Sequence, residues 1–475
     1  MNIRKKTKIV TTIGPATANL EMMKSLMKAG ANAFRLNFSH GDLKTHIETY
    51  ELARLAEKEL DKPLAIIQDL CGPKIRIGDF ETETVTLKKA STFSFYTQEM
   101  KGDETKVFIG YPNLIKEISK GERILIDDGK ISLVVKNIEK DFVEAEVVGG
   151  GTIRGRRGVS FPDSRLSLSS LTEKDKEALV GFKKNKVEYV ALSFVRSAKD
   201  ILELKEFLNK NDIKAKIISK VETREGVENI DEVIANSDAV MVARGDLAVE
   251  IGNENVPLVQ KKMIHKCNVA GIPVITATQM LESMVNVSTP TRAEVSDIAN
   301  AILDGTDAVM LSQETAIGNY PVEAVETMTN VAKKMEQDLI HRQAVDNRLE
   351  KKCKDIFTHD AITRAVTDVA EYVCSDFIVA VTETGFTARM IARWRPSQEI
   401  IALTTDVNVG RELAISFGCK SALIERITDV HEVIPSAKKI LLEHKLVKKG
   451  DKVVFSTGMP FGHNSKTNTL IVEEI

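Results

Sequence analysis

The chain has 475 residues, of which 43% are hydrophobic and 28% charged, with a formal net charge of −2. This balance is typical of a globular protein of several domains, and the near-neutral charge argues against nucleic-acid binding. The five cysteines include no Cys-x-x-Cys pair, and no apolar run approaches the roughly 18 residues of a membrane span, so we expect a cytoplasmic protein without a zinc site.

Eight short apolar segments alternate with amphipathic helical stretches. The predicted strands cover residues 8–13, 33–36, 64–69, 187–194, 215–220, 239–244, 273–278 and 308–312. Helical periodicity fills most of the intervals, for example from Leu20 and from Asp200. Eight strands separated by helices predict a (β/α)8 TIM barrel. A doubly wound sheet is the competing architecture, but no Gly-x-Gly-x-x-Gly opens a helix after the first strand.

The alternation is interrupted once and begins anew near the end of the chain. Between Asp69 and Leu171 short alternating strands and turn signals replace the helices. They predict a small β-barrel domain, residues 71–166, inserted after the third strand. A second strand–helix pattern after about residue 345 predicts a C-terminal α/β domain, residues 344–475. The TIM barrel would then combine residues 1–70 and 167–343.

The most informative motif is IISKVETREG, residues 217–226. Side chains alternate along a strand, so Lys220 and Glu222 lie on the same face. A third charged residue, Asp246, follows the sixth predicted strand. Lysine can neutralise an anionic substrate, and two carboxylates offer the oxygen ligands that Mg²⁺ prefers. A Lys-x-Glu pair taken alone is more often a surface ion pair, so the other strand ends decide between the two interpretations.

Polar and charged residues follow nearly every predicted strand, where a TIM barrel carries its active site. Together at successive strand ends, the cations and carboxylates indicate a site for an anion and a divalent metal. These residue types suit phosphoryl transfer, and no P-loop motif is present. The strand-end residues are Arg35, Asn37, Ser39, Asp69, Arg76, Ser193, Arg196, Lys220, Glu222, Arg244, Gly245, Asp246, Thr276, Thr278, Gln279, Ser312 and Glu314.

Five segments resemble the pyruvate kinase family. They are FRLNFSHG (34–41), IISKVETREG (217–226), VMVARGDLAVE (240–250), ITATQMLESM (275–284) and MLSQETAIGNYP (310–321). The similarity extends over the whole chain and is most specific in the barrel. It implies phosphoryl transfer from phosphoenolpyruvate to ADP, giving pyruvate and ATP, the last step of glycolysis. It also implies a homotetramer.

The resemblance implies roles for the strand-end residues. Lys220 would stabilise charge on the phosphoryl group and the enolate, and Arg35 would bind the phosphoryl group. The N–H groups of Gly245 and Asp246, with Thr278, would bind the substrate carboxylate. The residues implied to hold Mg²⁺ or Mn²⁺ are Glu222 and Asp246, those near the route of the proton to the enolate carbon are Thr278 and Ser312, and those on the nucleotide side are Asn37, His40, Arg76 and Arg157.

The inserted domain would be a lid with hinges near Gly72-Pro73 and Phe161-Pro162. Closing it would exclude water, which competes as phosphoryl acceptor.

One departure from the family concerns potassium. Asn37, Ser39 and Asp69 match the family's potassium ligands, with Leu70 where potassium users carry threonine. Lys74 stands where those members have glutamate, and lysine there accompanies independence from K⁺. A tethered ammonium supplies the positive charge that K⁺ would otherwise bring, so we expect that K⁺ is not required. Lys74 could instead be a solvated hinge lysine.

A possible effector site lies in the C-terminal domain. Its candidate residues follow an apolar strand at a strand-to-helix turn, where hydroxyl and N–H groups can hold a phosphate. In the family this place binds sugar phosphates or nucleotides such as AMP, although an ordinary helix N-cap would explain the same residues. The candidates are Thr382, Thr384, Gly385 and Thr387.

Two other functions compete with the kinase. One is a Mg²⁺-dependent barrel lyase that acts through an enolate, which would use Glu222 and Asp246 but would not need Arg35, Arg76 and Lys74 together. The other is an inactive kinase-like metabolite sensor, whose expected mark is the loss of an essential residue. Lys220, Glu222, Asp246 and Thr278 are all present.

Overall fold

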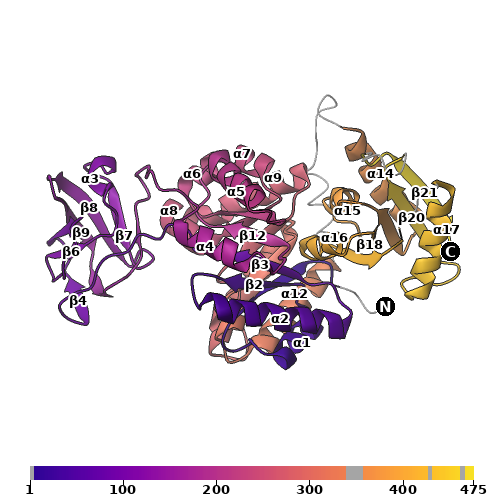
Figure 1. Ribbon diagram of the computed structural model, residues 1–475, viewed down its shortest axis with the longest axis horizontal. Helices are drawn as coiled ribbons and strands as arrows, with labels where there is room; N and C mark the ends of the chain where they lie inside the picture. Colours follow the sequence, from indigo (N-terminus) through magenta and orange to yellow (C-terminus); the bar gives the residue numbers. More distant parts are fainter. Residues whose placement is uncertain (1–4, 338–356, 426–429, 460–465) are drawn as a thin grey trace.

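The computed structural model describes residues 5–337, 357–425, 430–459 and 466–475. Three bodies follow one another along the long axis in Figure 1, with the inserted domain at one end, a barrel in the middle and the C-terminal domain at the other end. The boundary expected between residues 343 and 344 lies outside the described residues.

A closed barrel of eight parallel strands forms the middle of the molecule, which confirms the predicted TIM barrel. The strand order around it is β1-β16-β15-β14-β13-β12-β3-β2. Each predicted strand is present, with ends displaced by no more than two residues. The strands are β1 (Lys8–Ile13), β2 (Ala33–Asn37), β3 (Ala65–Asp69), β12 (Tyr189–Leu192), β13 (Lys216–Val221), β14 (Ala239–Ala243), β15 (Val274–Ala277) and β16 (Ala308–Leu311).

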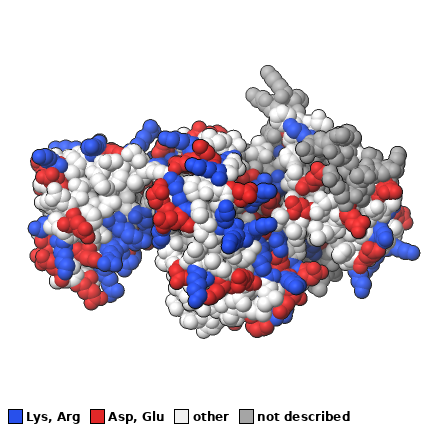
Figure 2. Space-filling view, viewed as in Figure 1, with Lys and Arg blue, Asp and Glu red and all other residues white. Residues whose placement is uncertain are grey.

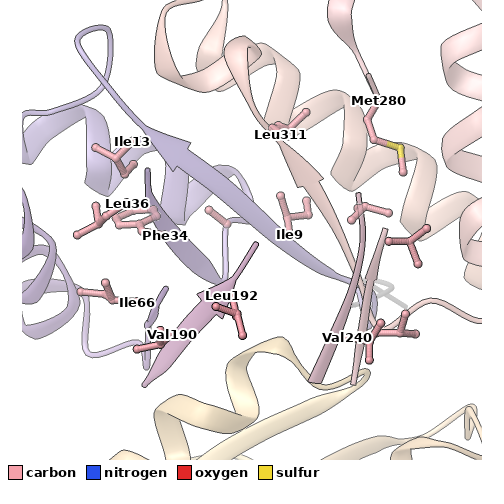
Figure 3. Close-up of a cluster of buried hydrophobic side chains, with 14 of the residues drawn as sticks. Ile9, Ile13, Phe34, Leu36, Ile66, Val190, Leu192, Val240, Met280 and Leu311 are labelled. Carbon is pink, nitrogen blue, oxygen red and sulfur yellow. The ribbon is translucent and has the colours of Figure 1, made fainter. Parts of the chain in front are cut away.

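Helices surround the barrel, and an apolar layer between strands and helices forms the largest core. Figure 3 shows side chains such as Ile9, Phe34, Val190 and Val240 in this layer. A buried strand has apolar side chains on both faces, which is why these segments are nearly continuous apolar runs. The helices are α1 (Leu20–Ala29), α2 (Leu43–Leu60), α4 (Glu173–Phe182), α5 (Ala198–Lys210), α6 (Arg224–Glu228), α7 (Ile230–Asn236), α8 (Arg244–Ile251), α9 (Val256–Ala270), α10 (Arg292–Leu303), α11 (Gln313–Ala316) and α12 (Pro321–Glu336), with 3-10 turns η1 (Asn253–Asn255) and η2 (Glu282–Val285).

The inserted domain is largely β-structure, as expected, but two details differ from the prediction. Its strands pair as a six-stranded sheet, β11-β7-β8-β9-β5-β6, and a two-stranded sheet, β10-β4, and not as one closed barrel. A helix of 4 residues, α3 (Leu114–Glu117), also interrupts the strands. The strands are β4 (Thr84–Leu87), β5 (Thr92–Tyr96), β6 (Lys106–Phe108), β7 (Arg123–Ile126), β8 (Ile131–Ile138), β9 (Phe142–Gly149), β10 (Gly151–Arg154) and β11 (Val159–Ser160).

The barrel holds both connections to the inserted domain. On the outgoing connection, the Asp175 carboxylate accepts the N–H groups of Cys71 and Gly72 at 2.9 and 3.2 Å. On the returning connection, the Arg196 guanidinium donates to the carbonyls of Leu166 and Leu168. These contacts place the inserted domain over the carboxyl ends of the barrel strands.

The C-terminal domain covers the opposite end of the barrel. Its five-stranded sheet has the order β19-β18-β17-β20-β21, antiparallel only at β21. Ala414 and Ile415 pack among the residues that fill the barrel interior, and Arg395 forms a buried ion pair with Asp307 just before β16. The elements are α14 (Thr358–Tyr372), β17 (Phe377–Val381), α15 (Phe386–Ala392), β18 (Glu399–Thr404), α16 (Val407–Glu412), η4 (Leu413–Ile415), β19 (Cys419–Leu423), α17 (Val430–Glu443), β20 (Lys452–Thr457) and β21 (Thr469–Glu474).

In the part of the chain that the structure describes, no helix has the length and apolar character needed to cross a bilayer.

Candidate active site

Charged side chains from β2, β3 and β13 meet at the carboxyl ends of the barrel strands. The Lys220 ammonium lies 3.0 Å from Glu222 Oε1 and 3.3 Å from Asp69 Oδ1, and it donates to Ser193 Oγ at 2.7 Å. On its other oxygen, Asp69 accepts from the Nε of Arg35. The structure therefore joins four charged residues from three strand ends, those of β2, β3 and β13.

Opposite charges keep Lys220 and Asp69 ionised despite burial. Burial alone would lower the pKa of Lys220, but the carboxylates of Asp69 and Glu222 outweigh it and hold that pKa above its usual value. Burial would raise the pKa of Asp69, and Arg35 and Lys220 together reverse that effect. Lys220 is thus a permanent cation at neutral pH.

Glu222 is fixed at both oxygens and lies close to a second carboxylate. Its Oε2 accepts the backbone N–H of Phe194 at 2.8 Å, while Oε1 faces Lys220. Burial raises the pKa of Glu222, and the charge of Asp246 raises it further. A cation between the two carboxylates would relieve this repulsion. No group of three or more His, Cys, Asp or Glu suited to a metal occurs among the described residues; two carboxylates are nevertheless what Mg²⁺ commonly takes, with water and substrate oxygens completing the shell.

A cleft of about 460 Å³ separates the inserted domain from the barrel. Lys74 and Gly158 line it from the inserted side, and Phe194, Asp246 and Glu250 line it from the barrel. Figure 2 shows the hollow between the two bodies, with basic residues gathered on the nearby part of the inserted domain. A ligand in this cleft would face Lys74 and Arg196 as well as the carboxylates of Asp246 and Glu250.

Thr278 lies beside the first turn of α8. The Gly245 N–H donates to Thr278 Oγ1 at 3.0 Å, which brings the ends of β14 and β15 together. Asp246 is the next residue in α8, whose N-terminal N–H groups lack partners within the helix. The structure thus joins Gly245, Asp246 and Thr278, three of the residues expected to bind the substrate.

Ser312 lies between the end of β16 and α11, at the N-cap position of that helix. Its N–H donates to Glu314 Oε2 at 2.6 Å, and Glu314 Oε1 accepts the N–H of Leu281 at 3.1 Å. Glu314 is fully buried. It therefore fixes the loop of Ser312 against the loop that follows Thr278.

The expected nucleotide residues form two separate groups. Asn37 and His40 follow β2, where Asn37 Oδ1 accepts the N–H of Ser39 at 3.2 Å. Arg76 and Arg157 belong to the inserted domain, where Arg76 donates to a backbone carbonyl and Arg157 pairs with Asp127 at 3.4 Å. Within the described residues, no hydrogen bond or ion pair joins the two groups.

The potassium-ligand positions are contiguous at the ends of β2 and β3. Asp69, the only carboxylate among them, already faces Arg35 and Lys220. The carbonyl of Leu70 accepts from Ser193 Oγ at 2.8 Å. Lys74 is exposed, and its side chain lies against Gly158 rather than against these residues.

Two contacts that hold the charged residues of the site could not be predicted from the sequence. Phe194 holds Glu222 through its backbone N–H and has a left-handed φ of 54°, which its residue type does not indicate. Ser193 is a predicted strand-end residue, but its hydrogen bond to Lys220 does not follow from the sequence. The strand-end position was the only signal available for either.

The four effector candidates lie between the end of β17 and the first turn of α15. Gly385 caps α15 with a left-handed φ of 74°, and the Thr384 carbonyl accepts from Arg389 at 3.1 Å. The hydroxyls of Thr387 and Thr467 lie 2.8 Å apart. Thr382 is buried at the end of the strand. The grouping is compatible with a phosphate cradle and equally with a helix N-cap.

Comparison with known proteins gives the same family for the whole chain. Residues 4–325 match the model of the pyruvate kinase barrel domain, and residues 360–473 match that of the pyruvate kinase alpha/beta domain. The chain is 43% identical to a pyruvate kinase of Clostridium perfringens over 99% of this chain and 100% of that protein. It is 39% identical to a pyruvate kinase of Thermococcus litoralis, over 99% and 98%.

A solved structure supports the same family. The crystal structure of a pyruvate kinase from Cryptosporidium parvum superposes with a TM-score of 0.92 at 37% identity, covering 99% of this chain and 96% of that one. The likeness spans the barrel, the inserted domain and the C-terminal domain. The chain belongs to the pyruvate kinase family.

Proposed function

We propose that this protein transfers the phosphoryl group of phosphoenolpyruvate to ADP, giving pyruvate and ATP, with Mg²⁺ or Mn²⁺ as the divalent metal. The observation that carries the proposal is the buried Lys220 ammonium held between Asp69 and Glu222 at the strand ends. Family membership supports the same reaction. A glycolytic role in the cytoplasm is the setting that we propose.

Lys220 and Arg35 would neutralise the phosphoryl group during transfer. Phosphoryl transfer depends on positioning and charge neutralisation more than on covalent intermediates. Lys220 stays charged in its buried site, so no proton has to be recruited. Glu222 and Asp246 would hold the metal, which when bound neutralises charge on substrate oxygens. Because Lys220 is already bonded to protein groups, we expect it to exchange Ser193 or a carboxylate for the phosphoryl oxygen.

The N-terminal turn of α8 would bind the substrate carboxylate. Gly245 and Asp246 would offer backbone N–H groups there, with the Gly245 N–H shared between Thr278 Oγ1 and the carboxylate, and glycine allows close approach. Thr278 would contribute its hydroxyl. After transfer the enolate needs a proton at carbon, and Thr278 and Ser312 lie on two adjoining loops from which it could be delivered.

ADP would lie between the barrel and the lid, residues 71–166. Asn37 and His40 would face it from the barrel, and Arg76 and Arg157 from the lid. The cleft of about 460 Å³ between the two bodies is lined by Lys74 and Asp246 but by none of these four residues. Closure of the lid about its two connections to the barrel, which Asp175 and Arg196 hold on the barrel side, would join the two groups and exclude water as a competing acceptor.

A coupled assay separates this function from its alternatives. Pyruvate should form from phosphoenolpyruvate only when ADP and a divalent metal are both present, with one ATP for each pyruvate. A lyase would consume its substrate without ADP, and an inactive sensor would bind phosphoenolpyruvate without turnover. Pyruvate formation that is independent of ADP would refute the proposal.

Three finer points complete the proposal. We expect full activity without K⁺, because Lys74 supplies a fixed charge beside the cleft.

We expect a homotetramer, and light scattering that shows only a monomer at micromolar concentration would contradict it. We expect a sugar phosphate or AMP to bind at Thr382, Thr384, Gly385 and Thr387; a panel of these compounds that leaves both kcat and KM unchanged would contradict it.

A further inference from the structure

The turn that carries Thr278 has an unusual backbone. Thr278 and Gln279 directly follow β15, and both adopt left-handed conformations, with φ of 68° and 53°. This region is uncommon for residues with a Cβ atom, and for a β-branched residue it is an outlier. Such a turn persists only where surrounding groups hold it. Whatever holds it therefore sets the position of the Thr278 hydroxyl.

The Arg244 side chain spans this turn. Its Nε donates to the carbonyl of Ala277 at 3.2 Å and its Nη2 donates to the carbonyl of Thr278 at 2.6 Å. On the far side, Nη1 donates to Asp297 Oδ1 at 2.8 Å, and Gln260 Oε1 lies at 3.4 Å. Only 10% of the side chain is exposed. The rigid guanidinium fork thus ties two consecutive carbonyls of the turn to helices α9 and α10.

Gly245, the residue after Arg244, contacts the side chain of Thr278. The Gly245 N–H donates to Thr278 Oγ1 at 3.0 Å. A hydroxyl that accepts this bond keeps its own proton for another partner. Arg244 and Gly245 together therefore set both the backbone of Thr278 and the orientation of its hydroxyl.

We infer that Arg244 is a positioning residue for the reaction, acting through Thr278 without touching the substrate. This inference rests on the proposed function for its kinetic consequence, but its structural part does not. The competing explanation is that Arg244 merely joins α8 to α10 through Asp297. A structural ion pair would affect stability without a specific effect on the chemical step.

Arg244→Lys distinguishes the two explanations. Lysine keeps the charge, but its single ammonium cannot hold both carbonyls and the carboxylate in the same planar arrangement. We expect kcat to fall between about tenfold and a hundredfold, as for other displacements of a reacting group, with KM for ADP unchanged. Exchange of the pyruvate methyl protons with solvent, which reports the proton step, should fall in parallel. An unchanged kcat in a folded variant would overturn the inference.

A double-mutant cycle with Thr278→Ala tests whether the effect passes through Thr278. Residues that act as a unit are not additive, so Arg244→Lys should cost little further activity once the hydroxyl is gone. Independent, additive losses would contradict the inference. If Arg244→Lys does not fold, Asp297→Asn replaces it. That variant loosens the anchor, and we expect a smaller fall in kcat that disappears in the Thr278→Ala background; an unchanged kcat would contradict the inference.

Arg54→Lys is the matched control. Arg54 is a similarly buried arginine that donates to the carbonyls of Leu64 and Lys186 and pairs with Glu188, but it does so at the opposite end of the barrel strands. Its substitution should lower the melting temperature with kcat retained. A crystal structure of Arg244→Lys provides a readout independent of activity: Thr278 and Gln279 should leave the left-handed region, and an unchanged turn would overturn the inference even if the proposed reaction were wrong.

Discussion

The Lys220 ammonium lies 3.0 Å from Glu222 Oε1, across a single intervening residue at the end of β13. Strand geometry brings the two side chains to one face, and Asp69 completes the pairing from β3. A buried carboxylate or ammonium without a partner of opposite charge would destabilise the folded protein. The site is therefore organised for charge neutralisation before any ligand arrives.

Lys220→Met should abolish most of the turnover. The substitution removes the buried cation from the transferring group, so kcat should fall by several orders of magnitude, and each factor of ten corresponds to about 1.4 kcal/mol. Steady-state kinetics beside a melting curve measure this. Lys216→Met, on the same strand but 40% exposed and paired with Asp238, is the control and should keep its activity. A Lys220→Met enzyme retaining more than about a tenth of wild-type kcat would contradict the role of Lys220.

Metal binding should weaken as the pH falls, and Glu222 should cause part of this change. Burial raises the pKa of Glu222, so the carboxyl takes up a proton at a higher pH than an ordinary glutamate, and the proton competes with the metal. Titration with Mn²⁺ at several pH values measures the apparent affinity. The uncharged isostere Glu222→Gln should bind Mn²⁺ more weakly with a flatter pH dependence. Equal affinity in both proteins would show that Glu222 is not a ligand.

Lys74→Glu should make activity depend on K⁺. The wild type should be nearly as active with tetramethylammonium as with K⁺ at constant ionic strength, because the Lys74 ammonium is always present. The variant loses this charge and should recover, in part, when K⁺ is added; Leu70 limits the recovery. Lys89→Glu, on an exposed part of the inserted domain, controls for the charge change. Strong activation of the wild type by K⁺ would show that Lys74 does not replace the ion.

Glu250 should make stability fall with rising pH. Burial raises its pKa to about 7 from a usual value of 4.5, with Asp163 and Asp246 adding to the rise. Between these two pH values the unfolded chain loses the proton and the folded protein keeps it, so folding is progressively disfavoured and the effect is complete above about 7. At 1.36 kcal/mol per pH unit the upper limit is about 3 kcal/mol.

Glu250→Gln removes this titration. Its melting temperature should exceed that of the wild type at mildly alkaline pH, and the gap should close towards pH 4.5. Glu443→Gln, on the exposed face of α17, should show no such trend. A gap between Glu250→Gln and wild type that is constant with pH would contradict the assignment.

Features that depend on residues close together in the sequence could be predicted from local patterns, whereas contacts between distant segments could not. The eight barrel strands could be predicted because buried parallel strands are continuous apolar runs, and the Lys220–Glu222 pair followed from alternation. The pairing of strands in the inserted domain could not be predicted, because alternation marks strands without giving their partners. The contact of Lys220 with Asp69 depends on closure of the barrel. The hydrogen bonds from Arg244 to the Thr278 turn depend on left-handed conformations of Thr278 and Gln279, which neither residue type favours.

The most direct test follows the phosphoryl group and the methyl protons of the product in one sample. Wild-type protein is mixed with phosphoenolpyruvate, ADP and Mg²⁺, and ³¹P and ¹H NMR spectra are recorded over time, with an EDTA-treated sample beside it. We predict that the phosphoenolpyruvate signal is replaced by the signals of the ATP γ-phosphate and the pyruvate methyl group in equal amounts, and that EDTA stops both changes. Release of inorganic phosphate in place of ATP, or turnover that persists in EDTA, would contradict it.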